Sequence, residues 1–292
     1  MTLLLTLFAQ AMADAHRQSR FGTEANLRRT ATSVARFIDG RNVTADDVSR
    51  QFVEAYANHL EGRGVCPNTI SFYMRNLRTV WRRACPCAIE NPFGTVFTGV
   101  ARTRKLAVDE SDIRHLSTLR LTNAGQRLSR DLFIFSYAAR GMSFVDVAYL
   151  RKSDISNGRI TYIRHKTGRP MSIKMTDTLR RIVESYAGST SPYVFPILTS
   201  SDSATAYAEY RRAINDHNRH LRQIAKRLPG HPRLTTYTAR HTWATAARDH
   251  GVRLGVISAG LGHASERTTQ IYLAEIADTT VDEANEMMTE GL

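Results

Sequence analysis

Apolar residues recur every three to four positions through the first 100 residues, which is the spacing of one helical face. Glycines at 22, 40, 62 and 64 separate the periodic segments. In the last of them Asn68 is expected to be the N-cap. The pattern predicts a four-helix unit, with helices near residues 2–20, 23–39, 45–61 and 68–84.

The opening run, residues 1–15, resembles a secretion signal in its leucines and small residues, but it has no basic start, and Thr6 and Gln10 interrupt it. We interpret it as an amphipathic first helix. No other segment approaches the roughly 20 apolar residues of a membrane span. Three cysteines are too few for a disulfide framework. The sequence therefore predicts a cytoplasmic protein with no membrane partner.

The second half is also mainly helical, with one exception. Residues 158–164 and 170–175 alternate apolar and polar positions on either side of a glycine-containing turn, which predicts a β-hairpin with Lys166 at its tip. A basic segment at 101–106 precedes a new helix start at Asp109. We expect two domains, residues 1–102 and 103–292.

The chain of 292 residues has a formal net charge of +13, and 35 of its 40 cationic residues are Arg. The guanidinium group suits bidentate phosphate contacts. Residues 1–102 have a net charge of +5 and the remainder +8, so both domains are basic. A nucleic acid held by both domains would explain this distribution better than a single basic tail would.

The stretch with the clearest chemistry is residues 239–245, Ala-Arg-His-Thr-Trp-Ala-Thr, followed by the Leu261-Gly262-His263 turn and by Tyr272, nine residues after His263. These residues closely resemble the C-terminal motif of the tyrosine recombinases, the phage integrase family. The resemblance extends over the second half and, more weakly, over the helical first half. It is strongest for the compact two-domain type found among bacterial mobile-element integrases and invertases.

The resemblance implies a mainly α fold: a four-helix core DNA-binding (SAM-like) domain, and a mixed, mostly helical catalytic domain with a small β-sheet and a C-terminal tail helix. It implies a site-specific DNA recombinase that cleaves and rejoins strands through a 3′-phosphotyrosine, integrating, excising or inverting a DNA element. The implied partner is double-stranded DNA with inverted half-sites, synapsed by a homo-tetramer. An accessory DNA-bending protein is compatible with this scheme.

By the same resemblance Tyr272 is the nucleophile, Arg240 and His263 contact the scissile phosphate, and Lys166 is the hairpin lysine. Fixed Arg donors stabilise the charge that develops on a phosphate under attack. An ammonium group is a candidate acid for the leaving 5′ oxygen. With guanidinium groups supplying the electrostatic stabilisation, we expect no metal and no cofactor.

Two positions depart from the family pattern. Ser143 stands where the first catalytic Arg is usual, three residues before Asp146. Arg140 is one helical turn further upstream, so we expect it on the same face of one helix as the substitute. Tyr237 stands where the family has the His of its His-x-x-Arg motif, and a phenol with a pKa near ~10 is a poor base at neutral pH.

Two further faces are basic. We expect a DNA-binding surface on the helix near 68–84 and another on a helix near 204–228, with the contacts made by Arg75, Arg78 and Arg82 and by Arg211, Arg212, Arg219 and Arg222. A solvated charged face is the alternative reading of the helix near 68–84. His217 and His220 have helical metal-ligand spacing, but the basic run around them disfavours a cation.

Two alternatives to a recombinase stay open on the sequence. Ser143 and Tyr237 fit a sequence-specific DNA-binding protein of the same fold that has lost catalysis. A type IB topoisomerase would share the chemistry but relax supercoils without a synapse.

Overall fold

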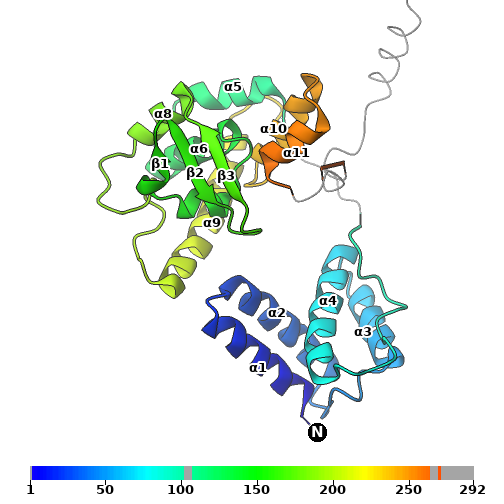
Figure 1. Cartoon of the computed structure of the whole chain (residues 1–292). Coiled ribbons are helices and arrows are strands. Elements are labelled where there is room, and N and C mark those ends of the chain that lie inside the picture. Colours follow the sequence, from blue (N-terminus) through cyan, green and yellow to red (C-terminus); the bar gives the residue numbers. More distant parts are fainter. Residues whose placement is uncertain (1, 102–106, 264–268, 271–292) are drawn as a thin grey trace, which may run out of the picture. The chain divides into compact units, whose positions relative to one another are not determined.

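A computed structural model of the chain describes residues 2–101, 107–263 and 269–270 (Figure 1). Within these ranges the chain forms eleven α-helices, one 3-10 helix and three β-strands. The residues group into two compact units, Met1–Thr103 and Arg104–Leu292. The mainly helical structure with one small sheet confirms the predicted fold class.

The N-terminal unit contains α1 (Leu4–Arg17), α2 (Phe21–Ile38), α3 (Arg50–Gly62) and α4 (Pro67–Ala84). In α1 the buried residues are Leu4, Phe8, Ala11 and Ala15, which are spaced to line one helical face, so the amphipathic first helix is confirmed. All four helices contribute to a single apolar core. Within it the Tyr56 hydroxyl, which is fully buried, donates a hydrogen bond to Ser33 Oγ at 2.7 Å.

The start of α4 differs from the prediction. Cys66 is the N-cap and Pro67 is the first helical residue, where a missing N–H costs nothing. Asn68 is not the cap, because its side chain bonds the backbone of Ala101 instead: Nδ2 donates to the carbonyl at 3.1 Å and Oδ1 accepts from the N–H at 2.8 Å. Asn68 thereby ties the last residues of the N-terminal unit to the start of α4.

The second unit is built around α6 (Ala124–Ala138). This helix packs against α5, α8, α9 and α10, and its residues Phe133 and Phe135 are among the largest fully buried side chains. The other helices are α5 (Glu110–Thr118), α7 (Phe144–Tyr149), the 3-10 helix η1 (Lys152–Asp154), α8 (Asp177–Glu184), α9 (Ser203–Ala225), α10 (Thr238–Asp249) and α11 (Leu254–Leu261).

The sheet consists of β1 (Ile155–Ser156), β2 (Arg159–Ile163) and β3 (Pro170–Lys174), antiparallel and in that order. Burial alternates along β2 and β3, and the inward-facing pair Ile160 and Ile173 are register partners. The predicted hairpin is confirmed, and Lys166 is an exposed residue of its turn.

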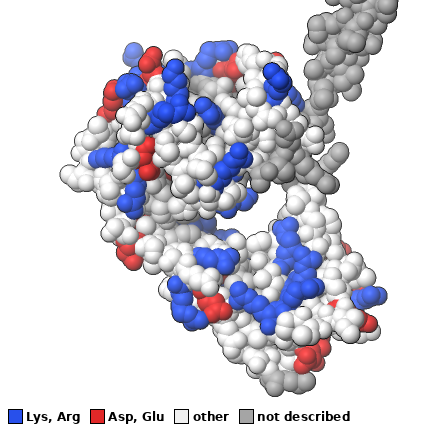
Figure 2. All heavy atoms as spheres, in the orientation of Figure 1, with Lys and Arg blue, Asp and Glu red and all other residues white. Residues whose placement is uncertain are grey.

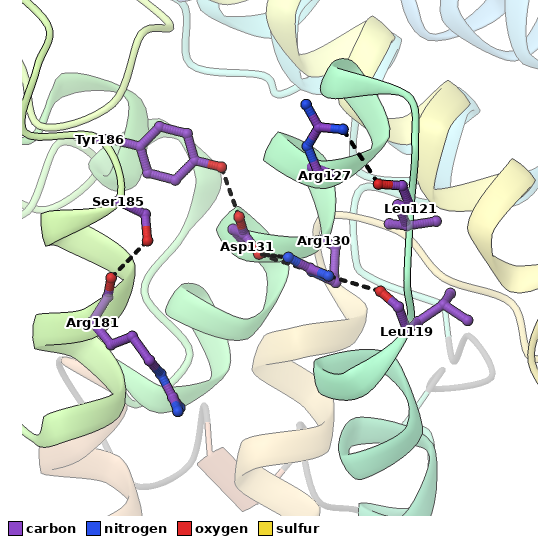
Figure 3. Close-up of polar contacts among 8 residues, drawn as sticks. All are labelled: Leu119, Leu121, Arg127, Arg130, Asp131, Arg181, Ser185 and Tyr186. Carbon is purple, nitrogen blue, oxygen red and sulfur yellow. Dashed lines mark hydrogen bonds and ion pairs between the residues drawn. The ribbon is translucent and has the colours of Figure 1, made fainter.

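Several arginines stabilise the fold itself. Arg127 and Arg130 of α6 donate hydrogen bonds to carbonyls of residues 119–122, the segment that follows α5 (Figure 3). Beside them the Tyr186 hydroxyl donates to Asp131 Oδ2 at 2.7 Å, which fastens the end of α8 to α6. Arg excess over Lys thus reflects internal hydrogen bonding as well as surface charge.

In the part of the chain that the structure describes, no helix combines the length and the apolar character that crossing a bilayer requires.

Candidate active site

Helix α10 carries Arg240 on its buried face. Before the helix, Thr235 N donates a hydrogen bond to Thr238 Oγ1 and the two hydroxyls share another, both at 3.0 Å, which fixes the first turn. Thr238, Ala239 and Thr242 are almost fully buried. Because α10 packs against α6 and α11, Arg240 points into the interior between them and is only 5% exposed.

The Arg240 guanidinium is held by groups from two distant segments. Nη1 donates to the carbonyl of Gly141 at 2.8 Å, and Nη2 donates to the carbonyl of Leu261 at 2.6 Å. Nη2 also lies 3.1 Å from Nε2 of His263. A buried cation requires such partners, and here they fix the direction of the guanidinium.

His263 is neutral at physiological pH. Burial, followed by the positive charges of Arg240, Arg164 and Lys166, lowers the pKa of His263 from 6.5 to about 4. Its Nε2 faces an Arg donor, so we assign the proton to Nδ1, which then donates to Thr269 Oγ1 at 2.7 Å. The imidazole is thereby fixed on both sides.

The structure brings Lys166 to the same place. Its ammonium lies within electrostatic range of His263, although the residues are almost 100 positions apart. The backbone next to it is anchored, since His165 N donates to Asp146 Oδ1 at 2.8 Å. Arg240, His263 and Lys166 therefore form one cluster, as the sequence motifs predict.

Arg140 is near this cluster, but it does not lie on a helix as expected. α6 ends at Ala138, and Arg140 has a φ of +59° and Gly141 a φ of +69°. Arg140 is therefore in a left-handed turn, and the expectation that it shares a helical face with Ser143 is wrong. It is half-buried, and its charge acts on the buried Tyr162 phenol together with those of Arg164 and Arg240. Arg140, in a turn rather than on a helix, is thus within electrostatic range of the same phenol as Arg240.

Ser143 has a structural partner of its own. It is the N-cap of α7, and its hydroxyl donates to Asp146 Oδ2 at 2.6 Å. Asp146 is 3% exposed and spans from this hydroxyl to His165 N. The serine thus helps to hold a buried carboxylate that anchors the hairpin.

Tyr237 and Tyr272 are the two remaining predicted site residues. Tyr237 immediately precedes α10, in the same first turn as Arg240, and is 56% exposed. Its ring centroid lies 6.0 Å from that of His241. Tyr272 lies outside the described residues.

Sequence reasoning missed three residues that build the cluster. Gly141 accepts from Arg240, while Arg164 and Arg169 of the hairpin donate to the carbonyls of residues 262 and 263. The basic run from 164 to 169 is visible in the sequence, but its partners are almost 100 residues away. Only the fold shows what these arginines bind.

The basic surface expected on α4 is present. Arg78 and Arg82, with Arg83 and Thr79, line an open hollow on this helix. Arg75 and Arg78 are half-buried and Arg82 is exposed. Figure 2 shows cationic side chains gathered over α4 in the N-terminal unit, where all of them are Arg.

On α9, the arginines at 212, 219 and 222 are exposed and Arg211 is half-buried. The two histidines of this helix have separate partners: His217 is buried and stacks on Phe144 with centroids 4.7 Å apart, and His220 Nδ1 lies 3.2 Å from Ser129 Oγ. Among the described residues, no three His, Cys, Asp or Glu side chains are arranged to hold a metal ion.

Residues 109–278 match the phage integrase family, and residues 3–89 match the phage integrase SAM-like domain. The chain belongs to the phage integrase family. Its activity class is that of a tyrosine-type, site-specific DNA recombinase. A protein called "Tyrosine recombinase" from Pseudothermotoga lettingae is 26% identical over 266 residues, covering 87% of this chain and 88% of that protein.

Solved structures of this family share the fold. A Tn1549 transposon integrase in complex with a circular intermediate DNA has a TM-score of 0.64 at 15% identity, covering 98% of this chain and 100% of that one. A lambda integrase dimer bound to a COC′ core site has a TM-score of 0.62 at 15% identity, covering 94% and 79%.

Proposed function

We propose that this phage integrase family member cuts one DNA strand with Tyr272 and rejoins it to a second DNA end, and that it acts in the cytoplasm. The observation that carries this proposal is the meeting of Arg240, His263 and Lys166, with Arg140 nearby. His263 stands nine residues before Tyr272 along the chain. The cluster is strongly cationic, which suits a phosphodiester whose negative charge grows during attack.

Each residue has a separate task in this scheme. The Tyr272 hydroxyl oxygen attacks phosphorus, the bond to the 5′ oxygen breaks, and a 3′-phosphotyrosine forms while the phenol proton passes to solvent. Arg140 and Arg240 stabilise the non-bridging oxygens, and the neutral His263 keeps Arg240 oriented. Lys166 protonates the leaving 5′ oxygen. Tyr237 donates a hydrogen bond to the phosphate from the start of α10.

The two compact units divide the DNA binding. The N-terminal unit, residues 1–102 in the predicted division, contacts the backbone through Arg75, Arg78 and Arg82 of α4. The catalytic unit, residues 103–292, adds Arg211, Arg212, Arg219 and Arg222 of α9. Both sets would contact phosphates, so they supply affinity with little sequence information.

We further propose that the protein works on inverted half-sites as a homo-tetramer, joining two duplexes for integration, excision or inversion of a mobile element. The covalent intermediate preserves the energy of the broken phosphodiester. Strand exchange therefore needs no nucleotide cofactor.

Capture of covalent adducts tests the chemistry and does not require a defined target sequence. Cells carrying the element and expressing the protein are lysed in detergent, and DNA linked to the protein is isolated and sequenced. We expect adducts at one short sequence, lost with Tyr272→Phe. No Tyr272-dependent adduct would identify a DNA-binding protein without catalysis.

Synthetic duplexes built on the recovered sequence then test recombination. Recombinant joints between two such duplexes are the expected product. Plasmid relaxation with no recombinant joint would indicate a topoisomerase instead.

A further inference from the structure

Three consecutive carbonyls at the end of α11 each accept a hydrogen bond from an arginine. Leu261 O accepts from Arg240, Gly262 O from Arg164 Nη1 at 2.8 Å, and His263 O from Arg169 Nη1 at 2.5 Å. The last carbonyls of a helix lack helical partners and carry partial negative charge, so cationic donors suit them well. We call Arg164 and Arg169 the hairpin clamp.

The clamp closes the turn that carries Lys166. Arg164 N donates to Arg169 O at 2.9 Å, and Gly168 N donates to Arg164 O at 2.8 Å. The two residues that close the turn by backbone bonds are therefore the same two whose side chains bind the end of α11. Lys166 sits between them, on a loop fixed at both ends.

Arg164 and Arg169 differ in their surroundings. Arg164 is 8% exposed, and its Cδ lies 3.5 Å from the position that a Cβ on Gly262 would take. Arg169 is an exposed residue, although its contact with His263 O is partly buried. Loss of Arg164 would leave a buried carbonyl without a donor, whereas loss of Arg169 leaves its acceptor accessible to water.

We infer that Arg164 and Arg169 are positioning residues for proton transfer: they hold the Lys166 turn against the His263 carbonyl and so keep the ammonium at a fixed place relative to Arg240. This inference rests on the proposed role of Lys166 as the acid. A long flexible side chain on a free loop would spend little time in the productive geometry, and small displacements in an active site cost large factors in rate.

A change of leaving group tests the clamp. Cleavage is measured on a nicked substrate with an ordinary phosphodiester and on one with a sulfur in place of the bridging 5′ oxygen. When the phosphorus–sulfur bond breaks, the 5′-thiolate leaves without a proton, so the acid is no longer needed. Lys166→Ala should be slow on the first substrate and near wild type on the second.

Arg169→Gln should respond to the two substrates in the same way as Lys166→Ala. We expect a decrease of roughly tenfold on the phosphodiester, recovery to within about threefold of wild type on the sulfur substrate, and partial recovery of the first rate in Arg169→Lys. Arg159→Gln is the matched control, because Arg159 lies at the far end of the same hairpin and its Nε donates to Ser172 Oγ at 2.7 Å. It should retain wild-type rates on both substrates.

The outcomes separate the two proposals. Recovery of Lys166→Ala but not of Arg169→Gln on the sulfur substrate would overturn the clamp and leave the acid assignment intact. A wild-type rate of Arg169→Gln on the phosphodiester would also overturn the clamp and leave the acid assignment intact. Failure of Lys166→Ala to recover would remove Lys166 as the acid, and the clamp's positioning role with it.

Discussion

Gly141 lies directly against Arg240. Its carbonyl accepts a hydrogen bond from Nη1 at 2.8 Å, and a Cβ placed on Gly141 would lie 2.9 Å from both Cα and Cγ of the arginine. The residue also has a φ of +69°, which disfavours any side chain. Glycine is thus required here both by the turn and by the closeness of α10.

Gly141→Ala should therefore damage fold and activity together. We expect a loss of about 2–5 kcal/mol in the free energy of unfolding, the sum of the costs of a left-handed alanine and of overpacking, and little cleavage. Gly158→Ala is the control, because its φ is +70° but nothing lies within 4 Å of its Cβ position. It should lose only about 1–2 kcal/mol and keep its cleavage rate. Urea unfolding and the nicked-substrate assay measure the two effects.

The charge of Arg140 can be tested apart from its unusual backbone. Asn tolerates the left-handed conformation, so Arg140→Asn removes the cation with little cost to the turn. Cleavage should fall by about 10²-fold or more, as expected for loss of a donor to the transition state. Ser143→Ala removes only the bond to Asp146 and should stay within about tenfold of wild type. A larger loss of cleavage in Ser143→Ala than in Arg140→Asn would show that Arg140 does not contact the phosphate.

The α4 surface should make a salt-dependent contribution to DNA affinity. Replacing Arg78 or Arg82 with Ala should weaken binding and reduce the slope of log affinity against log salt concentration by about 0.9 for each phosphate that the variant no longer neutralises. Arg28→Ala is a control of equal charge, because Arg28 is ion-paired with Glu24 at 2.5 Å. Equal slopes in all variants would show that the α4 arginines form a solvated face.

Two buried histidines should make the catalytic unit sensitive to acid. Burial lowers the pKa of His217 to about 3 and that of His263 to about 4, both below the usual 6.5. The unfolded chain therefore binds more protons as the pH falls below 6.5, and stability declines until the folded-state pKa values are reached. Each histidine should lower the free energy of unfolding by about 2 kcal/mol between pH 7 and pH 5.

His217→Phe tests this linkage. The ring stacks on Phe144, and its Nδ1 is buried with no hydrogen-bond partner among the described residues, so phenylalanine fits the site. The loss of unfolding free energy from pH 7 to pH 5 should be about 2 kcal/mol smaller than in wild type. His115→Gln, at an exposed position of α5, should leave the pH dependence as it is. An unchanged profile in His217→Phe would contradict the buried neutral state.

Helix and strand positions were predictable because they depend on local periodicity. The helical face of α1 and the alternation along β2 and β3 are both visible in the sequence and present in the structure. The N-cap of α4 was not predictable, because the Asn68 side chain bonds the backbone of Ala101, 33 residues away, rather than its own helix.

The prediction that the arginines mainly contact phosphates was also wrong in part. The sequence favours phosphate contacts as the reason for 35 arginines. In the structure, several donate to backbone carbonyls instead, among them Arg127, Arg130, Arg164 and Arg169. A planar group with five N–H donors serves a carbonyl as readily as a phosphate, and composition does not distinguish the two.

The sequence by itself determined the fold class, the family and the residue types of the site, because helical periodicity and motif spacing are local properties of the chain. Only the tertiary structure decided how the site is held. Arg240 meets Gly141 and Leu261, the hairpin clamp meets the end of α11, and Arg140 lies in a left-handed turn rather than on a helix. These relationships join segments up to about 100 residues apart, and packing between helices, which no local pattern encodes, sets them.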